Sequence, residues 1–237
     1  MTEDHISQIY NDELAKLEQL LTEMVGKCEW QMMTAIKTLT SHDPGLARDV
    51  VEADVALDML QAEIDELAIY VIAKRQPMAG DLRMTVGSMK IANDLERIGD
   101  YAKNIAKRVS TIADTASVRN LERSLERMSV QVVDMINDTL FALHNRSVER
   151  ANAVIKSDED VDSLYTSLFR EIITYMAEDP RIITACTHYL FIARNIERMG
   201  DHVTNIAEQI IYIIEGTSEL DRKNLDRTAA AMAPETE

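Results

Sequence analysis

A ten-residue string occurs twice in this chain, and the duplication constrains the fold more than any other feature of the sequence. The first copy, IANDLERIGD, covers residues 91–100, and the second, IARNIERMGD, covers residues 192–201. The segments that precede the two copies also correspond, and each ends near a proline, Pro77 or Pro180. Self-similarity at a fixed period is typical of a protein that contains two copies of one supersecondary unit.

The spacing of apolar residues predicts that both copies are helical. Apolar side chains recur every three or four positions, and the chain contains only 7 Gly, 4 Pro and 5% aromatic residues. Breaks rich in proline and polar residues divide this pattern into six helices. We expect the helices at residues 5–41, 44–74, 81–110, 117–144, 148–177 and 181–214. Asp81 is the candidate N-cap of the third helix.

The sequence therefore predicts an all-α protein made of two tandem three-helix bundles. We expect the first bundle at residues 1–114, the second at 115–216, and a disordered polar tail at 217–237. The first and fourth helices are long, so we expect them to carry one bundle into the next, with the bundles packed in series.

Charge and composition exclude several functional classes. A net charge of −16 argues against nucleic-acid binding, which requires a surface rich in lysine and arginine. The N-terminal residues lack the features of a signal peptide, and no apolar run reaches the ~20 residues of a membrane-spanning helix. Cys28 and Cys186 have no metal-ligand spacing and are expected to be buried thiols. We therefore expect a cytoplasmic protein without direct membrane insertion.

Two acidic pairs in each copy are placed so that they can face each other. Glu96 and Asp100 are four residues apart and project from one face of a helix, and the preceding helix carries a similar pair. In an antiparallel helix pair, positions that face each other have residue numbers with a constant sum. Both pairings in the first copy meet this condition: Asp54 with Asp100, and Asp58 with Glu96. The second copy repeats the arrangement with four further carboxylates: Asp158, Asp162, Glu197 and Asp201.

Such carboxylates repel one another unless cations neutralise them or their pKa values rise. An all-oxygen ligand set suits magnesium, manganese, iron or zinc, so we expect each copy to bind divalent or trivalent metal ions. Asn104 and Asn205, one turn further along, could supply an amide oxygen. Gly99 and Gly200 lie in mid-helix, where glycine costs ~1 kcal/mol relative to alanine. We therefore expect a partner helix or bound ions close to the backbone at both positions.

Other interpretations of the charged residues stay open at this point. Acidic stripes on helices are usually solvated faces, and we interpret Asp134 with Asp138, which has no counterpart in the first copy, as a surface pair. Arg97 and Arg198 are expected to point away from the carboxylates and to form salt bridges with other helices. His202 has no counterpart in the first copy and is not counted as a ligand.

The motifs of this chain resemble those of the PhoU family, the accessory and regulatory proteins of bacterial high-affinity phosphate transport. The resemblance extends from about residue 5 to residue 215. Its most specific parts are IAKRQP at 72–77, LERIGD at 95–100, ITYM at 173–176 and IERMGD at 196–201. Met199 stands where isoleucine is common in the family, a substitution that conserves volume.

The resemblance implies two tandem three-helix bundles that bind multinuclear metal clusters through the eight carboxylates given above. It also implies a cytoplasmic homodimer that restrains the phosphate-starvation response and modulates phosphate uptake. The implied partners are the ATPase subunit of the phosphate ABC transporter and a phosphate-responsive sensor histidine kinase. Such a protein is a scaffold and not an enzyme.

Two alternatives belong to other classes. A carboxylate-bridged di-iron enzyme would also be a helical bundle, but it uses Glu-x-x-His pairs, and no histidine of this chain has a glutamate three residues before it. A purely structural adaptor without metal would carry the same repeats. Phosphate-binding loops of the GxxxxGK[ST] type and nucleophile–histidine arrangements are absent from the sequence, which favours the non-enzymatic hypotheses.

Overall fold

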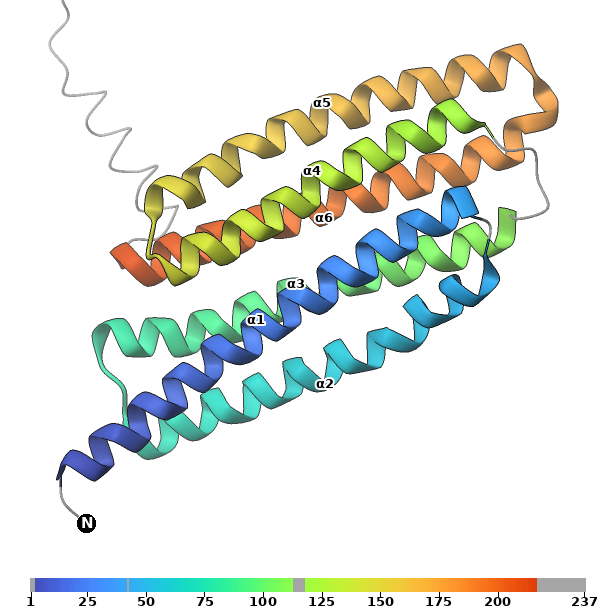
Figure 1. Ribbon diagram of the computed structural model, residues 1–237. Helices are drawn as coiled ribbons and strands as arrows, with labels where there is room; N and C mark the ends of the chain where they lie inside the picture. The colour runs from blue at the N-terminus through green and yellow to red at the C-terminus, as the bar shows by residue number, and fades with distance from the viewer. Residues whose placement is uncertain (1–2, 42, 113–117, 217–237) are drawn as a thin grey trace, which may run out of the picture.

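The computed structural model describes residues 3–41, 43–112 and 118–216, and these residues form helices joined by short turns (Figure 1). The helices are α1 (Glu3–Ser41), α2 (Pro44–Arg75), α3 (Ala79–Ile112), α4 (Arg119–His144), α5 (Val148–Glu178), the short 3₁₀ helix η1 (Pro180–Ile182) and α6 (Ile183–Glu215). The all-α prediction is confirmed, and each predicted helix end lies within two residues of the observed one.

The turns between helices follow from local side-chain chemistry. Asp43 caps α2, because its carboxylate accepts a hydrogen bond of 2.7 Å from the Gly45 N–H, and Pro44 occupies the first turn. The prediction that Asp81 caps α3 is wrong. Helix α3 begins two residues earlier, so Asp81 lies in its first turn, where it accepts a 2.8 Å hydrogen bond from the Tyr10 hydroxyl.

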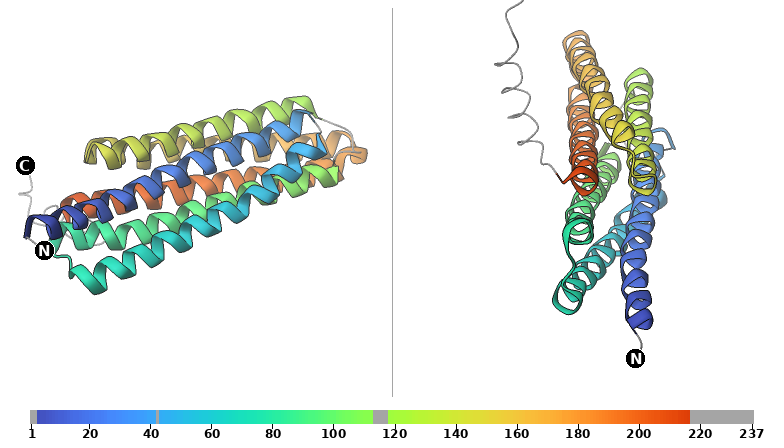
Figure 2. Two further views of the ribbon diagram at one scale, coloured as in Figure 1. Left: turned by 60° about the horizontal axis from the view of Figure 1, so that its bottom comes forward. Right: turned by 90° about the vertical axis from the view of Figure 1, so that its left-hand side faces the viewer.

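The six α-helices form two bundles, α1–α3 and α4–α6, as the duplication predicts (Figure 1). The expectation that the bundles pack in series is wrong, because they lie side by side. Helix α3 runs along α6, and α1 runs along α4 (Figures 1 and 2). Contact along whole helices buries far more apolar surface than an end-to-end junction would. At one close approach, a Cβ at Gly87 of α3 would lie 2.5 Å from Cδ1 of Ile213 in α6.

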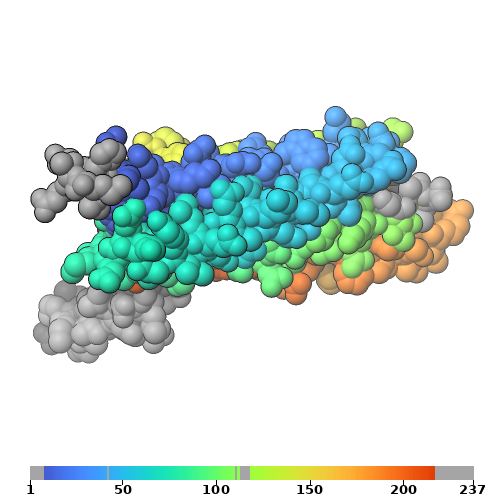
Figure 3. Space-filling view, turned by 90° about the horizontal axis from the view of Figure 1, so that it is seen from below, coloured from blue at the N-terminus to red at the C-terminus, as the bar shows by residue number. Residues whose placement is uncertain are grey.

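Side-by-side packing gives the molecule one continuous apolar core that draws on all six α-helices. Cys28 and Cys186 belong to this core, as predicted, and the Cys28 thiol donates a hydrogen bond of 3.1 Å to the Leu95 carbonyl. One long face of the molecule is covered by α2 (Figure 3). Within the described residues, no helix is both long and apolar enough to cross a bilayer. The predicted domain boundary at 114/115 and the predicted tail at 217–237 lie outside the described residues.

Candidate metal centres

Two acidic patches occupy equivalent places in the two bundles. The first lies between α2 and α3 and contains Asp54, Asp58, Glu96 and Asp100. The second lies between α5 and α6 and contains Asp158, Asp162, Glu197 and Asp201. The two helices of each hairpin bring their acidic pairs near each other: Lys103 bonds both Asp54 and Asp100, and each carboxylate whose pKa is raised is affected by a carboxylate of the facing helix. Each helix positions its pair through the four-residue spacing, which is about one turn.

The first patch contains a cation of its own, Lys103, which the pattern of acidic pairs did not indicate. The Lys103 ammonium donates hydrogen bonds of 2.5 Å to Asp54 Oδ2 on α2 and to Asp100 Oδ1 on its own helix. Burial alone would lower the pKa of Lys103, but these two bonds outweigh it and hold the pKa well above its usual range. Asp54 is buried, with 6% of its surface exposed, and Lys103 supplies the charge that stabilises its carboxylate there.

The other two carboxylates of the first patch have raised pKa values. Burial is the largest cause for both, followed by Asp54 for Asp58 and by Asp100 for Glu96. The expectation that Arg97 points away from the carboxylates is wrong. Its guanidinium lies 3.8 Å from a carboxylate oxygen of Glu96 and 3.6 Å from one of Asp100, because a long side chain can bend back along its own helix.

The second patch lacks an equivalent lysine, since Thr204 occupies the position that corresponds to Lys103. Burial, Asp162 and Asp201 together raise the pKa of Asp158 to about 6. Burial followed by Asp162 also raises the pKa of Asp201. Asp162 and Asp201 are exposed to solvent, so the patch is open on one side.

Glu197 is the buried carboxylate of the second patch, with 9% of its surface exposed. Its Oε1 accepts a hydrogen bond from Arg194, whereas its buried Oε2 has no hydrogen-bond partner among the described residues. Burial and then Asp201 raise its pKa. An orphaned buried carboxylate oxygen costs free energy, and a bound cation would remove that cost.

The two mid-helix glycines are explained by a close partner helix, one of the two alternatives predicted for them. A Cβ at Gly99 would collide with Cδ1 of Leu57 and lie 3.0 Å from Oε1 of Gln31. A Cβ at Gly200 would lie 2.6 Å from Oδ1 of Asp158. Both glycines therefore let the acidic helices approach closely, and Gly200 also leaves room for a carboxylate of the second patch.

The donor set of the second patch fits a hard cation, because it offers four carboxylates, one orphaned oxygen and no built-in lysine. Within residues 3–41, 43–112 and 118–216, no group of three or more aspartate, glutamate, histidine or cysteine side chains lies close enough together to hold a metal ion. Metal binding by the eight carboxylates therefore stays a prediction.

The remaining predicted side chains lie outside the two patches or at their edges. Asn104 and Asn205 line two clefts between α3 and α6. Asp138 pairs with Arg150 at 3.4 Å on the surface, as expected for a solvated pair. His202 Nδ1 lies 2.8 Å from Asp94 Oδ1 on α3, so this side chain connects the two bundles. The salt bridge expected of Arg198 is not found among the described residues, and its guanidinium instead lies 6.0 Å from the centre of the Tyr101 ring.

The fold and the two patches define a class: a tandem helical repeat protein with one acidic patch in each repeat. Comparison with known proteins agrees. The PhoU domain model matches the chain twice, at residues 21–109 and 125–210. The chain belongs to the PhoU family.

Relatives match the chain over most of its length. A protein of Rhizobium meliloti named phosphate-specific transport system accessory protein PhoU homolog is 44% identical, and the match covers 100% of each chain. A protein of Caulobacter vibrioides with the same name is 46% identical, over 91% of this chain and 94% of its own.

Solved structures agree with the fold. The crystal structure of PhoU from Pseudomonas aeruginosa matches with a TM-score of 0.83 and 35% identity, covering 88% of this chain and all of the other. The structure of the phosphate transport system regulatory protein PhoU from Streptococcus pneumoniae matches with a TM-score of 0.81 and 28% identity, over 88% and 98% of the two chains. The two tandem three-helix repeats of this chain are therefore the PhoU fold.

Proposed function

We propose that this protein is an accessory protein of a phosphate transport system that modulates phosphate uptake and restrains the phosphate-starvation response. The observation that carries the proposal is the match along the whole chain to a relative named for that system. In this proposal the protein acts in the cytoplasm as a homodimer. It connects the ATPase subunit of the phosphate ABC transporter with a sensor histidine kinase, and it does so by binding and not by catalysis.

The proposed scaffold contains metal ions at its two acidic patches. Facing carboxylates with raised pKa values support this proposal, and so does the orphaned Oε2 of Glu197. A divalent or trivalent ion such as magnesium, manganese, iron or zinc would neutralise the second patch and hold α5 against α6. Open coordination positions on the exposed side could accept a carboxylate or phosphate from a partner.

A pull-down from phosphate-replete cells tests the proposal. The bait is the full chain, compared with Asp158→Asn/Asp201→Asn, which removes two charges from the second patch. The matched control is Asp134→Asn/Asp138→Asn, which removes two charges from the surface of the same bundle. We expect the transporter ATPase subunit and the kinase to be captured by the wild type and by the control, with reduced capture by the patch variant.

Two results would contradict different parts of this proposal. Failure of the wild type to capture either partner contradicts the role in phosphate transport. Equal capture by all three proteins, together with equal metal content by elemental analysis, contradicts the role of the patch. Oxygen consumption by the metal-loaded protein would contradict the non-enzymatic scaffold.

A further inference from the structure

A cleft between the two bundles is lined by cations, although the chain as a whole is strongly acidic. It lies between α3 and α6 and has a volume of about 590 Å³. Lys107 and Arg108 line it from α3, and Arg194 and Arg198 line it from α6. None of the described residues that line it is acidic. Four cations in one cleft of a chain with a net charge of −16 concentrate positive potential there, which attracts an anion.

Three of these four cations form no salt bridge within the described residues. Arg194 contacts Glu197, and Arg198, although it forms no salt bridge, lies near enough to Glu197 and Asp201 to oppose the rise in their pKa values. Lys107 and Arg108 form no salt bridge with any residue of the described ranges. Aromatic rings position two of the guanidinium groups instead. Arg108 lies 4.0 Å from the centre of the Phe191 ring, and Arg198 lies over Tyr101. A guanidinium that stacks on a ring keeps its N–H edges available for an anion.

Because the chain is duplicated, the cationic cleft can be compared with a cleft at the equivalent position of the same molecule. A second cleft of about 420 Å³ lies at the equivalent place between α3 and α6, and six of its lining residues occupy positions equivalent to residues that line the first. Glu208 and Gln209 stand there in place of Lys107 and Arg108, and Asn93 stands in place of Arg194. The second cleft is also lined by Asp65 and Asp94, with one cation, Lys90. The two repeats therefore form two equivalent clefts between α3 and α6, and only one of these clefts is lined mainly by cations.

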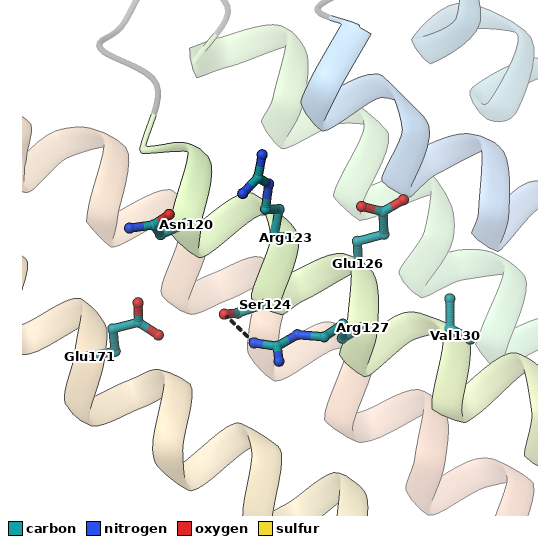
Figure 4. Close-up of a pocket in the computed structure, with 7 residues that line it drawn as sticks. All are labelled: Asn120, Arg123, Ser124, Glu126, Arg127, Val130 and Glu171. Atoms are coloured by element: carbon teal, nitrogen blue, oxygen red, sulfur yellow. Dashed lines mark hydrogen bonds between the residues drawn. The ribbon is translucent and has the colours of Figure 1, made fainter.

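A larger cleft of about 820 Å³ on α4 and α5 does not show this concentration of charge. Its two arginines, Arg123 and Arg127, point in different directions, and Arg127 donates a hydrogen bond of 3.2 Å to Ser124 (Figure 4). Glu126 and Glu171 line the same cleft and balance its charge.

We propose that the cationic cleft between α3 and α6 binds a phosphate group, either as inorganic phosphate or as part of a nucleotide. Arginine donates paired N–H groups that match the oxygens of phosphate, and lysine adds a point charge. A multiply charged oxyanion neutralises four cations better than one carboxylate does. Asn104 and Asn195 line the same cleft and present side-chain amides to the remaining oxygens. The volume accommodates either source.

Calorimetric titration of the full chain with inorganic phosphate, ADP and sulfate tests the proposal. The protein is first treated with a chelator, so that phosphate cannot bind through a metal ion, and ionic strength is held constant. The test variant is Lys107→Gln/Arg108→Gln, which leaves Arg194 and its contact with Glu197 intact. The control is Lys90→Gln, which removes the cation of the equivalent cleft. Circular dichroism checks that each variant is folded.

We expect saturable binding to the wild type and to the control, and affinity at least about tenfold weaker in the test variant. Tighter binding of ADP than of inorganic phosphate identifies a nucleotide as the ligand, and the reverse order identifies free phosphate. Three results would overturn the proposal: no saturable binding to the wild type, an unchanged affinity in the folded test variant, or equal affinity for sulfate and phosphate. The outcome is independent of the metal proposal, because the protein is free of metal throughout.

Discussion

Replacing Lys103 by threonine, the residue at the equivalent position of the second repeat, should make the first acidic patch resemble the second. The Lys103 ammonium bonds Asp54 and Asp100 at 2.5 Å, and its side chain and that of Asp54 are 21% and 9% exposed. Breaking a fully buried ion pair costs about 3–5 kcal/mol, and a hydrogen bond to a charged group contributes about 1.5–3 kcal/mol. Because Lys103 is partly solvated, we expect a loss of about 1–3 kcal/mol in the metal-free protein.

Metal ions should reverse this loss. With Lys103 absent, a divalent cation can occupy the position between Asp54 and Asp100, and an ion at about 100 times its Kd would add about 2.7 kcal/mol. Denaturation by urea, in chelator and with added magnesium, manganese or zinc, measures both effects. The reciprocal variant Thr204→Lys should stabilise the metal-free protein and lower its metal content.

Two outcomes would refute this reasoning. If the Lys103→Thr protein unfolds at the same urea concentration as the wild type in chelator, the ammonium does not stabilise the patch. If added metal stabilises the wild type and the variant equally, Lys103 does not compete with metal ions for these carboxylates. Elemental analysis of both proteins after dialysis provides the second, independent readout.

Three further predictions concern single side chains. The raised pKa of Asp158, about 6, means that the folded state binds its proton more tightly than the unfolded state does, so stability should fall as pH rises. In chelator, Asp158 should contribute about 1 kcal/mol of added stability between pH 7 and pH 5, a value reduced for solvent exposure, so Asp158→Asn should gain about 1 kcal/mol less than the wild type over this range. Gly99→Ala should lower the stability of the protein by about 1–3 kcal/mol, because the new Cβ would clash with Leu57. Gly26→Ala should instead stabilise the protein by about 0.5–1 kcal/mol, because no atom lies within 4 Å of its new Cβ. Thermal unfolding of the two variants measures the difference. The Cys28 thiol is fully buried and its pKa is well above the usual range, so a disulfide reagent should modify it only when the protein unfolds.

The helices and the pairing of the carboxylates were predictable because both depend on local spacing. Helical periodicity locates each helix, and the position of a turn fixes which residues of two antiparallel helices face each other. Asp54 therefore shares Lys103 with Asp100, the residue of α3 that its number predicts it to face. The duplication strengthened the prediction, because the same alignment of facing carboxylates occurs in both helical hairpins.

The packing of the two bundles and the role of Lys103 were not predictable in the same way. A side-by-side arrangement depends on which helical faces remain apolar after each bundle has formed, and α3 and α6 are far apart in the sequence. Lys103 follows Asp100 by three residues, which was visible, but its long side chain reaches α2 only if the helices approach closely. Leu57 packed against Gly99 shows that they do.

The duplication also shows where the two repeats have diverged, and the divergence concerns charge. Helix α3 carries Lys103, Lys107 and Arg108, and the equivalent positions of α6 carry Thr204, Glu208 and Gln209. One lysine of α3 bonds two of the four carboxylates of the first acidic patch, while the other two cations face the cleft shared with α6. The second repeat therefore retains the open acidic patch, and the first repeat supplies two of the cations of the shared cleft. Helix α6 takes part in both the proposed metal site and the proposed phosphate site, because Arg194 lines the cleft and contacts Glu197 of the patch.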